Sequence, residues 1–198
     1  MRTRSCERKM RRKQGQIEMS ELENRSRPKT EEELNAILRE AYDHACKSNY
    51  SQALEICNWL LDDPSTETAA LRERSSVREH MNDWDGAIDD LQLVVQKVAV
   101  EPADFHALGL LMLQQRTASE AEQCFTQAIE LSKKLRNTYY TNSARLLRAE
   151  SRLRQGDYLK SIDDCKALPS GYSVYVSGSG MRSREDIEAE AQRQLNKR

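Results

Sequence analysis

The chain lacks any apolar run that could cross a membrane. No stretch approaches the roughly 20 consecutive apolar residues that a transmembrane helix needs, and 32% of all residues are charged. An apolar segment of about 7 to 15 residues, as found in secretory signal peptides, is also missing after the first residue. We therefore expect a soluble protein that stays in the cytoplasm.

Cysteine and histidine are too few and too scattered for a disulfide framework or a metal centre. The five cysteines are odd in number, and none are paired at metal-ligand spacing. Cys57 and Cys165 recur at equivalent positions of the repeat described below, as small core side chains would. The three histidines are isolated, without a second ligand nearby: His44, His80 and His106. The sequence thus predicts no metal site and a reducing compartment.

Motifs of catalysis and of nucleotide binding are absent as well. The chain has no nucleophile elbow and no catalytic cysteine signature. The Gly-rich segment 178–183 could precede a helix N-terminus, but it lacks the spacing and the lysine of a phosphate-binding loop. The acidic pairs Asp89-Asp90 and Asp163-Asp164 fall in predicted helices, where we expect them to face solvent or a neighbouring arginine. The chain is predicted to be a non-enzyme without a cofactor.

What the chain does contain is a repeat of small residues. Ala53, Ala87 and Ala121 are spaced 34 residues apart, and Ser161 follows 40 residues after Ala121. A helix–turn–helix unit of this length cannot bury its own apolar face, so neighbouring units must stack on it. The small side chains are expected where the two helices of a unit cross closely. A period of this length is typical of helical repeat families, and on that resemblance we expect an all-α solenoid that serves as an interaction scaffold.

The four prolines mark the boundaries of this scheme, since proline inside a helix removes a hydrogen bond and clashes with the preceding turn. Pro28 precedes the first repeat, Pro64 and Pro102 separate repeats, and Pro169 ends the fourth. With the apolar periodicity they predict eight helices, at residues 31–47, 50–62, 67–81, 84–99, 102–115, 118–136, 138–154 and 158–168. The six extra residues before the fourth repeat are expected to lengthen its flanking helices.

The repeats resemble those of the tetratricopeptide family. The third repeat follows the family's W-x2-L-G-x2-Y spacing with Phe105, Leu108, Gly109 and Met112. The fourth is similar to co-chaperone repeats in the stretches Arg148-Ala149, Gly156-Asp157-Tyr158 and Ile162 to Leu168. The resemblance covers about Leu34 to Leu168. It implies a right-handed superhelical solenoid of four repeats, at about 34–67, 68–101, 102–135 and 142–169.

Residues 1–30 form a basic arm before the repeats, with ten Lys or Arg against four Glu. We expect this arm to be poorly ordered and solvated, because it lacks the aromatic side chains that stack on nucleic-acid bases. An arm that binds nucleic acid or an acidic surface is the alternative. A third interpretation is that the natural start is Met19, since Met19 to Leu22 resembles an ordinary beginning.

The end of the chain departs from the repeat pattern. Three of its seven glycines fall within residues 171–180, and the segment Tyr172 to Val176 between them is strand-like. We expect residues 170–182 to form a loop that lies against the repeats, either as ordinary capping or inside the binding groove as an internal ligand. Ser183 is predicted to cap a last helix over 183–198, which covers the end of the solenoid.

In this family the first helix of each repeat lines a concave groove that usually binds peptides. The inward positions give the candidate partner-binding residues Asn35, Leu38, Tyr42, Arg72, Ser76, Glu79, His106, Leu110, Leu113, Leu146, Glu150, Leu153 and Arg154. Chaperone-binding members hold a C-terminal carboxylate in a clamp of Lys, Asn and Arg. Leu38 and Tyr42 stand at the lysine and asparagine places, so the clamp is not recognisable here.

The resemblance therefore implies a non-catalytic module that binds a protein or peptide segment in its groove, as an adaptor or assembly factor. The mixture of aliphatic and charged groove positions suits a segment with apolar anchors. The first alternative is a dedicated inhibitor of one partner, such as a bacterial immunity protein or antitoxin. The second is a nucleic-acid-linked regulator that uses the basic arm, although nucleic acid and membrane partners are not expected.

Overall fold

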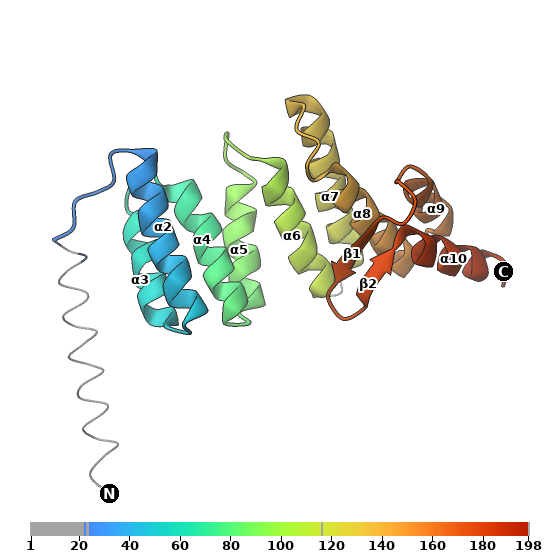
Figure 1. Cartoon of the computed structure of the whole chain (residues 1–198), viewed down its shortest axis with the longest axis horizontal. Helices are drawn as coiled ribbons and strands as arrows, with labels where there is room; N and C mark the ends of the chain where they lie inside the picture. Colours follow the sequence, from blue (N-terminus) through green and yellow to red (C-terminus); the bar gives the residue numbers. More distant parts are fainter. Residues whose placement is uncertain (1–21, 23, 116, 198) are drawn as a thin grey trace, which may run out of the picture. The chain divides into compact units, whose positions relative to one another are not determined.

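The computed structural model describes residue 22, residues 24–115 and residues 117–197. Figure 1 shows the helices and the single strand pair formed by these residues. The helices are α2 (Glu31–Cys46), α3 (Tyr50–Leu61), α4 (Glu67–His80), α5 (Trp84–Val94), α6 (Pro102–Gln114), α7 (Ala118–Leu135), α8 (Thr141–Gln155), α9 (Tyr158–Lys166) and α10 (Arg184–Leu195). The strands are β1 (Ser173–Val176) and β2 (Gly180–Ser183).

The helix boundaries agree closely with the sequence prediction. Seven of the eight predicted repeat helices begin at the expected residue, and α8 begins three residues later, at Thr141. The largest difference is at the end of α5, which stops at Val94 rather than near residue 99. The chain continues from there in short turns, and Val98 is fully exposed. Most of the predicted basic arm, residues 1–21 and 23, lies outside the described residues.

Local sequence explains several helix ends. The Thr30 hydroxyl accepts a hydrogen bond from the Glu33 amide at the start of α2. Pro102 is the first residue of α6, where its missing N–H costs no intrahelical bond. Gly156 ends α8 in the left-handed region, with φ of 81°, a conformation that glycine adopts without a steric penalty.

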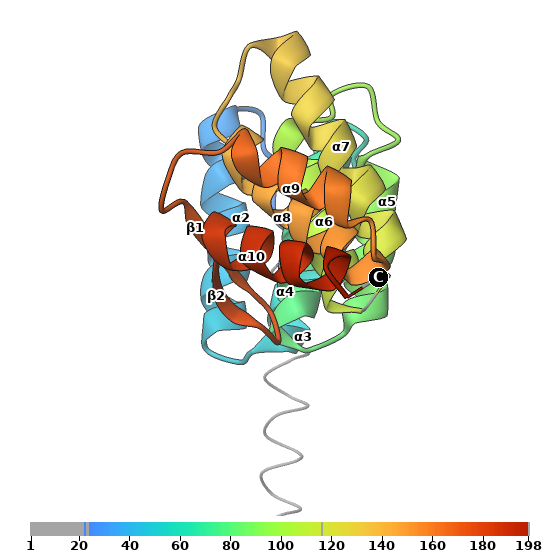
Figure 2. The ribbon, with the colours of Figure 1, turned by 90° about the vertical axis from the view of Figure 1, so that its right-hand side faces the viewer.

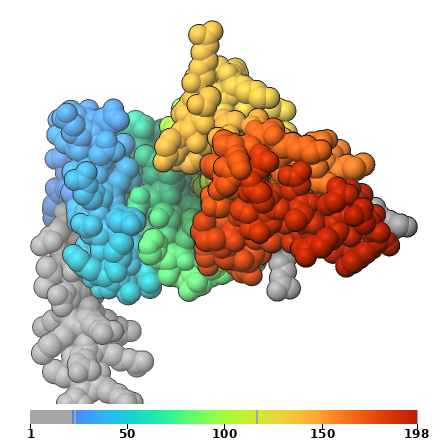
Figure 3. All heavy atoms as spheres, turned by 45° about the vertical axis from the view of Figure 1, so that its right-hand side comes forward, coloured from blue at the N-terminus to red at the C-terminus, as the bar shows by residue number. Residues whose placement is uncertain are grey.

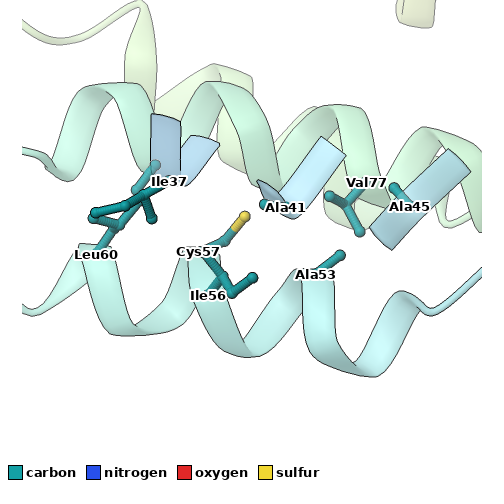
Figure 4. Packing of buried hydrophobic residues seen from close by; sticks show 9 residues of the cluster. Ile37, Ala41, Ala45, Ala53, Ile56, Cys57, Leu60 and Val77 are labelled. Atoms are coloured by element: carbon teal, nitrogen blue, oxygen red, sulfur yellow. The ribbon is translucent and has the colours of Figure 1, made fainter. Parts of the chain in front are cut away.

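The chain divides into two compact units, Met1–Asp90 and Leu91–Arg198. In the first unit α2, α3 and α4 pack around a core of aliphatic and small side chains (Figure 4). Cys57 lies within this cluster, fully buried, between Ile37 and the small pair Ala41 and Ala53. Burial raises the pKa of the Cys57 thiol to about 12. This cysteine therefore acts as a small apolar core residue, as its repeat position predicted.

The small residues of the repeat lie where paired helices cross. In the first unit the Ser75 hydroxyl donates to the Ala87 carbonyl at 3.0 Å, and in the second unit the Ser161 hydroxyl donates to the Ala149 carbonyl at 2.8 Å. All four residues are almost fully buried. The serine stands on the first helix in one repeat and on the second helix in the other. Either placement satisfies the buried hydroxyl, so a serine can replace alanine at this crossing.

One acidic residue of each Asp–Asp pair is buried against two arginines. Asp90 accepts two hydrogen bonds from Arg74, at 2.9 and 2.6 Å, and Arg78 lies 2.9 Å away. Asp164 repeats this arrangement with Arg148 and Arg152 in the second unit. Asp89 and Asp163 remain exposed. The sequence predicted that these pairs face solvent or a neighbouring arginine. In each pair the first aspartate faces solvent and the second faces arginine, so the prediction is confirmed.

The second unit continues the helical pairs and ends in a hairpin and a capping helix. β1 and β2 pair antiparallel, with Tyr175 opposite Met181, and β1 packs against α8 (Figures 1 and 2). α10 packs against α9 and α8, and Ser183 and Asp186 form the capping box at its start. The segment predicted as a loop over 170–182 therefore contains a strand pair. In the described part of the chain, no helix is long and apolar enough to cross a membrane.

Candidate partner-binding site

The candidate partner-binding residues lie on two faces, one in each unit. We call the side of α2 and α4 that carries Asn35, Leu38, Tyr42, Arg72, Ser76 and Glu79 the α2–α4 face. The corresponding side of α6 and α8, with His106, Leu110, Leu113, Leu146, Glu150, Leu153 and Arg154, is the α6–α8 face. α2 contacts α4, and α6 contacts α8, so each face joins residues that are far apart in the sequence.

The α2–α4 face is open. Tyr42 is the largest of its exposed side chains, with 46% of its surface accessible, and Asn35 is exposed beside it on the same helix. The other four residues are partly exposed: Leu38, Arg72, Ser76 and Glu79. This face thus offers an aromatic and an aliphatic side chain together with charged groups, and Tyr42 and Asn35 are its most exposed members.

Tyr42 is surrounded by polar neighbours that the repeat register did not select. Its ring meets the His80 ring edge to face, with the centroids 6.0 Å apart. A hydrogen bond to the Cys46 side chain is the largest of the effects that raise the pKa of Tyr42. Cys46 is one turn beyond Tyr42 on α2, so helical spacing alone could have selected it. His80 ends α4 and could be placed beside Tyr42 only from the packed structure.

Two carboxyl groups give the α2–α4 region acidic character. Burial raises the pKa of both Glu73 and Glu79, and the charge of His80 partly offsets this effect in each case. The Oε1 atom of Glu73 is buried, with no hydrogen-bond partner among the described residues. A buried carboxylate oxygen without a donor is costly. No sequence motif marks Glu73.

The α6–α8 face is largely covered, which corrects the sequence prediction for four of its residues. Leu113, Leu146, Glu150 and Leu153 are all buried, with at most 8% of their surface exposed. Leu146 and Leu153 belong to a core cluster with Ile187 and Ala191 of α10, and Tyr172 and Val174 pack against it. These side chains are thus internal to the second unit rather than available to a partner in this conformation.

The charged residues of the α6–α8 face are also engaged within the chain. Glu150 accepts from the guanidinium of Arg154 at 2.9 Å and from that of Arg182, in β2, at 3.1 Å. Arg154 donates further to the Leu113 carbonyl and to the Ser179 hydroxyl in the hairpin turn. The hairpin therefore satisfies polar groups on α8 that a peptide ligand would otherwise meet.

His106 and Leu110 are the partly exposed residues of α6 on this face. The His106 Nε2 atom lies 2.8 Å from the Ser143 hydroxyl of α8, and its ring contacts those of Phe125 and Tyr140. Burial lowers the pKa of His106 to about 4, so the imidazole is neutral at pH 7. In this setting His106 joins α6 to α8, and Leu110 is left as the more available side chain.

The described residues contain no group of three or more His, Cys, Asp or Glu placed to hold a metal ion. The four described cysteines, Cys46, Cys57, Cys124 and Cys165, are free thiols. Burial raises the pKa of Cys124 to about 11 and that of Cys165 to about 12. Both thiols are therefore protonated at neutral pH and poorly nucleophilic.

No family model matches the chain, and no curated protein matches it in sequence. Solved structures do. A crystal structure of MamA protein is 14% identical, with a TM-score of 0.60 over 83% of this chain and 88% of that chain. The putative kinesin light chain TPR-like repeats of Podosopora anserina, also 14% identical, match with 0.60 over 86% and 90%. BtubC from P. vanneervenii, 12% identical, matches with 0.53 over 84% and 77%.

At these identities the structural likeness defines the fold. The chain has the tetratricopeptide-repeat fold, an all-α helical solenoid, as its 34-residue period predicted.

Proposed function

We propose that this protein is a non-catalytic binding module that holds a segment of another protein on its α2–α4 face. The observation that carries this proposal is the contrast between equivalent repeat positions. Tyr42 is 46% exposed on α2, whereas Glu150, at the equivalent place on α8, is buried. A large aromatic side chain held in solvent at a ligand-facing repeat position is typical of a binding hot spot.

The chemistry of the α2–α4 face suits a partner segment that has an apolar anchor next to a basic residue. Leu38 and Tyr42 provide the apolar contact, since aromatic anchors supply large areas at low entropic cost. Glu73 and Glu79, both partly buried, provide acceptors for a lysine or arginine of the partner.

The decisive experiment compares partner capture by the unmodified full chain with capture by three variants. Tyr42→Ala removes the anchor, and Tyr139→Ala is the matched control, because Tyr139 is 82% exposed in the loop before α8. Each version is used as bait in a cell extract, with quantitative mass spectrometry, and the dissociation constant of each purified pair is then measured. We expect Tyr42→Ala to weaken binding about tenfold or more, and Tyr139→Ala to leave it unchanged.

Glu79→Lys, the third version, tests the charge of the partner. It should weaken binding at least as much as Tyr42→Ala, because a basic partner residue would then face a like charge. Circular dichroism checks that each variant keeps its helical content. Partners that bind all versions equally would contradict the proposed face. One very tight partner would favour the inhibitor alternative, and capture dominated by salt-sensitive nucleic acid would favour the regulator.

A further inference from the structure

The hairpin presents a distinct side to α8. Along β1 the side chains alternate, with Val174 and Val176 turned inward and Tyr175 exposed between them. Arg182 pairs across the strands with Val174 and is also partly buried, whereas Met181 is 63% exposed. The inward side of the hairpin is therefore apolar with one arginine.

This inward side meets the α8 positions that the repeat register assigns to a ligand. Arg182 donates to Glu150, and the Ser179 hydroxyl accepts from Arg154 at 3.1 Å. Val174 packs against the cluster that contains Leu146 and Leu153, and Tyr172, just before the hairpin, does the same. The four α8 residues predicted to contact a ligand are thus engaged within the chain. Glu150 and Arg154 bind the hairpin, and Leu146 and Leu153 belong to the cluster against which the hairpin segment packs.

Three glycines lie just before the hairpin or in its turn. Gly171, Gly178 and Gly180 all have positive φ, between 72° and 76°, and a Cβ at any of them would meet nothing within 4 Å. Glycine reaches such angles freely, so Gly171 provides a hinge before β1, whereas Gly178 and Gly180 shape the turn between the two strands. A two-stranded hairpin is also marginally stable by itself in water. Contacts with α8 therefore hold it in place.

The capping helix α10 has anchors of its own, although β2 runs directly into it and Arg182 pairs with Glu190 of α10 at 2.7 Å. Its Ile187 and Ala191 are fully buried against α8 and α9, and Ser183 with Asp186 caps its first turn. Figure 3 shows the red C-terminal segment as a continuous surface over the orange helices of this unit. Opening of the hairpin would break the Arg182–Glu190 ion pair but would leave the apolar contacts of Ile187 and Ala191 with the last repeat.

We propose that the α8 face is a second binding site, for an extended partner segment with alternating β-branched residues and an arginine that pairs with Glu150. The chain's own hairpin is the resident occupant of this site and closes it until such a segment displaces it. This second site adds a second face to the proposed function. It rests on that function only because both faces are formed by the first helices of repeats. A tethered occupant acts at an effective concentration of about millimolar, so the site stays closed to weak competitors.

A peptide of residues 171–184, labelled with fluorescein, is the probe for this site. Its binding to the full-length chain is measured by fluorescence polarisation. Arg182→Ala removes the ion pairs with Glu150 of α8 and Glu190 of α10 and loosens the internal occupant, while α8 keeps its own residues. We expect this variant to bind the peptide at least tenfold more tightly than the unmodified chain. Adding Glu150→Ala should remove most of the gain, because the arginine of the peptide then keeps only Glu190 of α10 as an acceptor.

Met181→Ala is the matched control, since Met181 is exposed next to Arg182 and lies on the outward side of the hairpin. It should bind the peptide as weakly as the unmodified chain. A folded Arg182→Ala chain that binds no better than this control would overturn the proposal. Dimerisation of that variant would instead assign the site to a second copy of the chain and would equally overturn it.

If Arg182→Ala does not fold, hydrogen exchange on the unmodified chain decides. Ladder amides of β1 and β2 that exchange while α8 and α10 stay protected support a separately opening hairpin. Exchange of the hairpin only together with α8 and α10 would show a fixed cap and overturn the proposal. None of these readouts involves Tyr42, so their failure leaves the α2–α4 face to be judged by its own experiment.

Discussion

Replacement of Asp164 by alanine is expected to lower the free energy of unfolding by about 3–5 kcal/mol. Asp164 is 5% exposed and receives three hydrogen bonds, two from Arg148 and one from Arg152, between 2.7 and 2.9 Å. Without the carboxylate, the largely buried guanidinium group of Arg148 loses its counter-charge, whereas Arg152 keeps Glu122 at 2.8 Å. Removing one partner of a buried ion pair costs more than the pair itself contributes, because the remaining charge stays desolvated.

The first unit offers an independent test of the same arrangement. Asp90 is 1% exposed and is held by Arg74 and Arg78, so Asp90→Ala should be about as harmful as Asp164→Ala. Thermal unfolding followed by circular dichroism would show a fall of roughly 6–20 °C for either variant, at about 2–4 °C per kcal/mol for a chain of this size.

The adjacent aspartates are matched controls for these two variants. Asp89 and Asp163 are exposed one residue earlier on the same helices, so their replacement by alanine should change the free energy of unfolding by about 0.5 kcal/mol or less. Equal losses at both members of a pair would show that helix charge, rather than the buried ion pair, is responsible.

Gly109→Leu should lower the free energy of unfolding of the second unit by about 3 kcal/mol, the upper end of the range that is usual for overpacking a core. A Cβ at Gly109 would lie 2.7 Å from a ring carbon of Phe125, closer than real Cβ atoms approach other atoms. Phe125 is fully buried, so its ring has no free space to move into. The loss should appear although leucine is a better helix former than glycine by nearly 1 kcal/mol.

The exposed Ala36 on α2 provides the comparison for Gly109→Leu. Ala36→Leu adds a similar side chain in open solvent and should leave the melting temperature almost unchanged. Combining Gly109→Leu with Phe125→Ala should give less than the sum of the two losses, because the smaller side chain makes room for the leucine. Strict additivity would show that the two positions are not in contact.

Much of the fold could be predicted because its determinants are local and periodic. Pro102, the small residues of the repeat and the apolar spacing placed most helix starts at the observed residue. The end of α5 could not be predicted in this way, since it depends on where burial ceases. The strand β2 was missed because Gly180 to Ser183 has no strand-like composition, and it becomes a strand only by pairing with β1.

The candidate site could be predicted only in part, because the repeat register cannot tell which positions are covered. Leu38 and Leu146 occupy equivalent places in their repeats, yet Leu38 is partly exposed and Leu146 is fully buried. The cover over Leu146 comes from Val174 and Ile187, which lie about 30 to 40 residues further along the chain and outside the repeats. Such a contact leaves no trace in the spacing of either segment.

Hydroxyl-radical footprinting of the full-length chain tests most directly the claim that one first-helix face is open and the other is closed. Comparing Leu38 with Leu146 removes differences in intrinsic reactivity, since both are leucines at equivalent repeat positions. We predict that Leu38 and Tyr42 are oxidised and that Leu146 and Leu153 are protected, as their burial requires. Oxidation of Leu146 at the rate of Leu38 would contradict the closed α6–α8 face.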